Sequence, residues 1–158
     1  MSRQTINDMF SVSLPESFEL MSAEDLSELS RNGGDPYRWG ARDRENHVMI
    51  VALWKQYPAI LARMTDLKTI AKRNEQLTRR VYEGHDYRFL GSSTLQAGVK
   101  KAEGYSFSYR LEGVAQVVNS YLIRDGKMIY TFLCNGREAN NATNQAIFRE
   151  MLEDLQVL

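Results

Sequence analysis

Hydrophobic and polar residues alternate near the start of the chain, where Phe10, Val12 and Leu14 are separated by two serines. A period of two is typical of a strand with one buried face. Beyond Pro15, Ser22 and Asp25 have the spacing of an N-cap and its partner, which predicts a helix. We expect strands over residues 10–14 and 18–21, followed by a short helix that ends at Asn32-Gly33-Gly34.

Two apolar stretches, Tyr37 to Arg42 and His47 to Trp54, flank the polar segment 43–46. This arrangement predicts a hairpin with a polar turn. The second arm is apolar on both faces, as expected of a central strand that is covered on both sides.

Apolar residues at helical spacing predict an amphipathic surface helix that begins near Thr65 or Asp66 and ends before Gly84. The expected apolar stripe consists of Leu67, Ile70, Ala71, Leu77 and Val81. The segment before it, residues 56–65, is apolar enough that we expect it to pack against the rest of the chain.

Four strand candidates follow, over residues 87–95, 105–112, 116–124 and 127–134. Asp125-Gly126 joins the last two and predicts a type I′ hairpin turn. Consecutive hairpins make an antiparallel meander. A closing helix is predicted by the apolar stripe of Ile147, Phe148, Met151, Leu152, Leu155 and Leu158. No repeat or linker divides the chain, so we expect one domain over residues 1–158 of the α+β class.

The charge of the chain is balanced, with 20 basic and 20 acidic residues. A balanced charge gives no general attraction to nucleic acid, and no apolar run is long enough to span a membrane. Residues 55–80 carry seven Lys or Arg against two acids, a cluster that solvated helix faces also produce. The start of the chain lacks the apolar core of a signal peptide, and the single Cys134 forms no internal disulfide, so we expect a cytoplasmic protein.

Residues suited to catalysis are few. Only His47 and His85 are histidines, which is too few for a typical metal site, and Cys134 falls on a strand face with apolar neighbours. No glycine-rich phosphate loop is present. We therefore expect no enzyme activity, no metal and no cofactor.

Aromatic and arginine side chains gather on the first hairpin. Such residues are enriched at interface hot spots, so the candidate protein-binding residues are Tyr37, Arg38, Trp39, Arg42 and Trp54. The alternative is that both tryptophans fill the core.

Three stretches, residues 10–18, 120–132 and 148–155, together with the order of the elements, resemble the PsbP-like and Mog-type fold family, which includes many small bacterial proteins of unknown function. The resemblance implies a central antiparallel β-sheet flanked by helices on both faces. It also implies a bacterial adaptor, a partner-binding subunit or, in one bacterial branch, a chaperone for secreted effector proteins.

These patterns favour a non-enzymatic protein-interaction domain with a protein partner, present as a monomer or homodimer. That function predicts an exposed apolar or aromatic concave patch. One alternative is a small-molecule or lipid-binding module with an enclosed apolar pocket between the sheet and the helix over residues 65–82. A structural subunit that forms oligomers is a further alternative.

Overall fold

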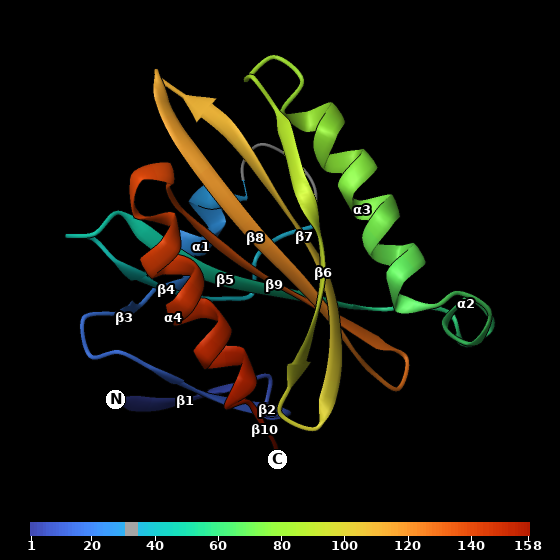
Figure 1. Ribbon diagram of the computed structural model, residues 1–158. Helices are drawn as coiled ribbons and strands as arrows, with labels where there is room; N and C mark the ends of the chain where they lie inside the picture. The colour runs from blue at the N-terminus through green and yellow to red at the C-terminus, as the bar shows by residue number, and fades with distance from the viewer. Residues whose placement is uncertain (31–34) are drawn as a thin grey trace.

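A computed structural model describes residues 1–30 and 35–158 of the chain. A large antiparallel sheet lies at its centre, with helices on both faces, and a small sheet holds both termini (Figure 1). The strands are β1 (Ser2–Ile6), β2 (Phe10–Leu14), β3 (Glu19–Leu20), β4 (Trp39–Asp43), β5 (Val48–Gln56), β6 (Arg88–Ala97), β7 (Lys100–Leu111), β8 (Val114–Asp125), β9 (Met128–Arg137) and β10 (Gln156–Val157). The helices are α1 (Ala23–Leu29), α2 (Ala59–Met64), α3 (Leu67–Val81) and α4 (Asn141–Glu153), with a 3-10 turn over Glu138–Asn140.

The large sheet has seven strands in the order β3-β4-β5-β9-β8-β7-β6, and the small sheet has the order β1-β2-β10. Neighbouring strands of the large sheet all pair antiparallel. The α+β class and the central antiparallel sheet with helices on both faces are thereby confirmed.

Residues that pair directly across the strands share one face of the sheet. One such row joins Gly40, Val51, Leu133, Ser120, Tyr105 and Ser92. Ile70 and Ala71 of α3 pack on the Tyr105 end of this face, and Leu26 of α1 lies against the Gly40 end. Both α1 and α3 therefore cover the same face.

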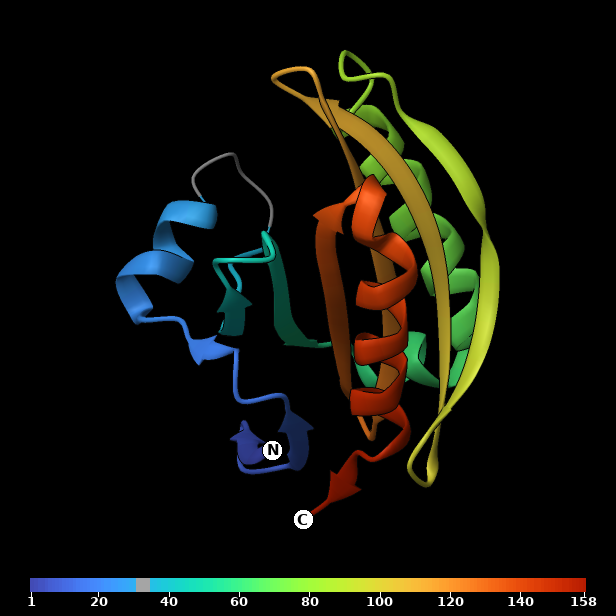
Figure 2. The same cartoon turned by 60° about the vertical axis from the view of Figure 1, so that its left-hand side comes forward.

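The opposite face of the large sheet carries the main core. α4 and the small sheet pack there, and Figure 2 shows α4 lying along the large sheet with both termini at one end. Phe10, Tyr130 and Phe148 are fully buried in this core, and the Phe10 and Tyr130 rings meet edge to face at 4.8 Å. The predicted stripes of β2 and of the closing helix supply Phe10 and Phe148, and β9 supplies Tyr130.

A second core lies under α3 and is rich in aromatic residues. Phe107 and Tyr109 of β7 contact Tyr82, whose ring centroid is 4.4 Å from that of Tyr109. Burial raises the pKa of the Tyr109 and Tyr82 phenols, since the charged phenolate is disfavoured away from water.

Most predicted elements are present close to their expected bounds, including the first hairpin, the long helix and the four-strand meander. Ser22 caps α1 through a capping box with Asp25, as the spacing predicts. The helix ends at Leu29, and the predicted stop at Asn32-Gly33-Gly34 lies outside the described residues, which end at Ser30 and resume at Asp35.

Three local predictions are wrong in whole or in part. The segment before α3 packs only in part: Tyr57 lies against the second core, but residues 59–64 form a helix whose Ile60 and Met64 side chains are 71% and 81% exposed. The β8–β9 turn is centred on Gly126 and Lys127, and only the glycine has positive φ, as in a type II′ turn. Leu158 is exposed because the closing helix ends at Glu153 and a short strand follows it.

The apolar stripe of α3 is also only partly correct. Ile70 and Ala71 are buried, but Leu77 and Val81 are exposed and Glu75 is buried in their place. The helix packs on β7 and β8, and Glu75 can occupy a buried position because its carboxylate has hydrogen-bond partners.

Candidate functional site

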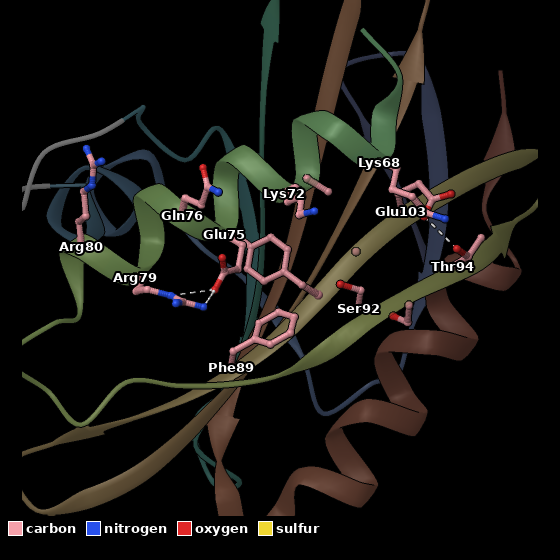
Figure 3. A pocket seen from close by; sticks show the side chains of 14 residues that line it. Lys68, Lys72, Glu75, Gln76, Arg79, Arg80, Phe89, Ser92, Thr94 and Glu103 are labelled. Atoms are coloured by element: carbon pink, nitrogen blue, oxygen red, sulfur yellow. Dashed lines mark hydrogen bonds and ion pairs between the residues drawn. The ribbon is translucent and has the colours of Figure 1, made fainter.

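An open cleft of about 890 Å³ lies between α3 and the strands β6 and β7 (Figure 3). Ala71, Phe89 and Tyr105 give it an apolar floor, and Lys68, Lys72 and Arg79 project from α3 along its rim. A volume of this size is within the range of ligand pockets. The position, between the sheet and the long helix, is the one expected for the alternative function, but the cleft is open and charged rather than enclosed and apolar.

The start of α3 is held in place by polar contacts. The Asp66 carboxylate accepts a 2.8 Å hydrogen bond from the Thr69 amide, which lowers the pKa of that carboxyl group. Arg124 of β8 donates a 2.6 Å hydrogen bond to the carbonyl oxygen of Thr65. These contacts fix where α3 begins over the sheet, and they therefore fix the distance between the rim of the cleft and the strands.

A bulge in β6 brings two of its side chains to the cleft. Phe89 pairs with Phe107 and Ser92 pairs with Tyr105, so Leu90 and Gly91 together occupy one position of the ladder. Without the extra residue, positions 89 and 92 would point to opposite faces, because side chains alternate along a strand. Gly91 has a φ of 140°, which favours glycine at that point.

Glu75 lies at one end of the cleft and is 7% exposed. Its carboxylate accepts a 2.7 Å hydrogen bond from the Tyr87 hydroxyl and another of 2.7 Å from Arg79, whose guanidinium lies 5.6 Å from the Tyr87 ring centroid. The Glu75 hydrogen bond raises the pKa of Arg79, and burial together with the same carboxylate raises the pKa of Tyr87. These contacts neutralise the buried charge at this end of the cleft.

Glu103 is the second buried carboxylate, on β7 near the other end. It accepts a 2.8 Å hydrogen bond from Thr94 of β6, and the Lys101 ammonium lies 3.5 Å from it. Both carboxylates of the cleft therefore already have partners.

The rim of the cleft is left with excess positive charge. Within residues 1–30 and 35–158, no carboxylate lies within ion-pair distance of Lys68 or Lys72. In Figure 3, Lys68 lies toward Thr94 and Glu103, Lys72 lies in the middle of α3, and Arg80 points away from the strands. Two exposed ammonium groups above an apolar floor can attract a ligand that is both acidic and partly apolar.

The sequence-predicted candidates do not form one patch. Trp39 and Trp54 both pack into the main core, Trp39 half-buried and Trp54 buried. The exposed Arg38 lies over the Trp54 ring, 4.8 Å from its centroid. Arg42 is on the opposite face of β4 and donates a 3.2 Å hydrogen bond to Asp25 of α1.

Tyr37 lies apart from both groups. Its amide donates to the Ser30 hydroxyl, and its pKa is raised by burial and by the neighbouring Tyr109 phenol. Whether any of the five candidates binds a partner stays a prediction. The cleft residues were not singled out by sequence, although the cationic cluster over residues 55–80 includes three of its rim side chains.

Cys134 is buried, and burial raises the pKa of its thiol to about 12, as expected of a core cysteine. In the described part of the chain, no group of three or more His, Cys, Asp and Glu side chains could hold a metal ion. No helix within that part is both long and apolar enough to cross a membrane.

Two solved structures share the arrangement of this chain. CyanoP, the cyanobacterial PsbP of Synechocystis sp. PCC 6803, aligns with a TM-score of 0.71 at 11% identity, over 99% of this chain and 92% of that chain. The chain has a PsbP-like fold. LpqN of Mycobacterium tuberculosis, described as involved in cell envelope biogenesis, aligns with a TM-score of 0.63 at 14% identity, over 94% and 82% of the two chains.

The expected PsbP-like resemblance is confirmed at the level of the fold. No family model matches the chain, and no curated protein matches it. At such low identities the likeness carries no residue of a functional site from one protein to the other.

Proposed function

We propose that residues 1–158 form a single non-enzymatic protein-interaction domain, and that it works in the cytoplasm. In this proposal, the α3–β6 cleft holds an acidic and partly apolar segment of a partner protein. The observation that carries the proposal is the pair Lys68 and Lys72, which stand above the apolar floor without a carboxylate partner among the described residues. Complementary charge steers association and selects the partner.

The surroundings of the two lysines support a binding role. Phe89 is 43% exposed at the floor of the cleft, so apolar surface is left uncovered beside the cations. Glu75 and Glu103, the acidic side chains that could have neutralised the rim, are held by Arg79, Tyr87, Thr94 and Lys101. An incoming carboxylate would meet ammonium groups that have no competing partner in the cleft.

Fluorescence anisotropy with two labelled peptides tests the proposal. One peptide alternates glutamate with valine, and its matched control alternates lysine with valine at the same length. We expect the acidic peptide to bind at least about tenfold more tightly, and its affinity to fall as salt rises. Equal affinity of the two peptides, or no binding of either, would contradict the proposal.

A second candidate is an anionic amphiphile such as a fatty acid, which the volume and the apolar floor of the cleft favour. Oleate is a suitable probe. A rise in melting temperature with oleate that the acidic peptide does not produce would favour this candidate over a protein partner.

Arg38, exposed over Trp54, is a second proposed contact on the opposite side of the sheet. Replacing Arg38 with alanine leaves the cleft unchanged. A partner that loses affinity in this variant but not in cleft variants would place its contact on the first hairpin, as the sequence predicts.

A further inference from the structure

The strand β6 forms one edge of the large sheet, has ten residues and carries a charge only at its first residue, Arg88. In the described part of the chain it pairs only with β7. From Phe89 to Ala97 it contains no charged residue and no proline, although proteins usually protect a free edge with one or the other. The opposite edge strand, β3, has only two residues and includes Glu19. Of the two edges of the large sheet that the described residues form, the β6 edge is thus the one left open to another strand.

The cleft and this edge are adjacent. Phe89 and Ser92 of β6 line the cleft, and Leu90 at the bulge is 54% exposed. We infer that the acidic partner segment binds as an added antiparallel strand along β6, like every other strand pair of the large sheet, with every second side chain directed toward α3. The inference rests on the proposed function and specifies the conformation and sequence pattern of the partner.

The spacing of the two lysines fits such a strand. Four residues of an α-helix rise about 6.0 Å, and two residues of a strand rise about 6.6–6.8 Å. Figure 1 shows α3 lying alongside β6. Acidic side chains at positions i and i+2 of the added strand can therefore each meet one of Lys68 and Lys72, while main-chain hydrogen bonds to β6 supply affinity.

A second copy of this chain fits the edge less well. Pairing β6 with β6 about a two-fold axis would bring two α3 helices to the same face, with Lys68, Lys72 and Arg79 of each copy facing the other. Like charges brought together across an interface disfavour it. An acidic segment instead complements the rim.

Peptides methylated on backbone nitrogen test strand addition on the unmodified protein. One version of the glutamate-valine peptide is methylated at its odd positions and the other at its even positions. Successive backbone N–H groups of a strand point to opposite edges, so each version lacks the N–H donors of one edge. We expect one version to bind at least about tenfold more weakly than the other, because only one edge of an added strand faces β6.

The outcomes separate the two proposals. If the unmethylated peptide binds and both methylated versions bind equally, strand addition is wrong and the cleft proposal stands. If the unmethylated peptide does not bind, both are wrong. A stable dimer that Ser92→Lys separates would assign the edge to a second copy and overturn the inference.

Discussion

The hydroxyl of Tyr87 donates a 2.7 Å hydrogen bond to the buried carboxylate of Glu75, and this contact joins the second half of α3 to the residue just before β6. Arg79 binds the same carboxylate oxygen from the solvent side. This end of the cleft therefore contains a buried charge that is stabilised by one phenol and one guanidinium.

Replacing Tyr87 with phenylalanine should lower the free energy of unfolding by about 1.5–3 kcal/mol, the usual range for a hydrogen bond to a charged group. Urea denaturation measures the change. Tyr82→Phe is the matched control, because the Tyr82 hydroxyl has no side-chain hydrogen bond to a described residue and its loss should cost less than about 0.5 kcal/mol. Equal losses in the two variants would contradict the stated role of Tyr87.

Alkaline pH should destabilise the fold through the tyrosines near α3. The phenols of five tyrosines have a pKa raised above 10.0, and burial is the largest cause in each: Tyr37, Tyr82, Tyr87, Tyr105 and Tyr109. The folded state thus favours the neutral phenols, so their contribution to stability is complete below pH 10.0 and decreases as pH rises above it.

Urea denaturation at a series of pH values from about 8 to about 11 tests this expectation. The free energy of unfolding should fall above pH 10.0, and the fall should be smaller in Tyr82→Phe, which removes one of the five phenols. The Cys134 thiol acts in the same direction, because its pKa is raised from 9.0 to about 12, so Cys134→Ala is a necessary second control. A free energy of unfolding that increases above pH 10.0 would contradict the burial of these phenols.

Cys134 should not react with a thiol reagent in the folded protein. Its side chain is 1% exposed, and the raised pKa keeps it in the unreactive thiol form near neutral pH. Labelling with iodoacetamide should therefore require urea. Rapid labelling of the native protein would contradict its position in the core.

Gly104 lies where a side chain cannot fit. A Cβ atom there would overlap the carbonyl oxygen of Ser120 and would come within 2.6 Å of the Tyr121 ring. Gly104→Ala should destabilise the protein by about 1–3 kcal/mol or more, as overpacking does. Gly84→Ala, where no atom lies within 4 Å of the added Cβ, should leave the melting temperature nearly unchanged.

Much of the fold could be predicted from sequence, because in most elements the helix caps and the spacing of apolar residues agree with the observed burial. Asp66 caps α3 where the spacing places a helix start, and the apolar positions of β2 and α4 meet in one core. The first strand was missed because residues 2–6 are mostly polar. Arg3 is held by hydrogen bonds to Ser11, Ser13 and the distant Asp154, contacts that no local pattern reveals.

The cleft was harder to predict, because it depends on tertiary contacts. The cationic cluster of α3 could be read from the sequence, but solvated helix faces have the same composition. Gly91 within a strand pattern was the one local sign of the bulge that turns both Phe89 and Ser92 toward α3. The buried Glu75 is stabilised by the distant Tyr87 hydroxyl, whereas the apolar stripe of α3 predicted that Leu77 and Val81 would be buried.

Charge reversal on the rim tests the central claim most directly. The variant Lys68→Glu with Lys72→Glu changes the two cleft lysines, and Lys127→Glu with Arg149→Glu makes the same change in charge at exposed positions outside the cleft. Anisotropy titration with the glutamate-valine peptide should show at least about tenfold weaker binding in the first variant and nearly unchanged affinity in the second. Equal weakening in both variants, or undiminished binding in the first, would contradict the assignment of the α3–β6 cleft as the binding site.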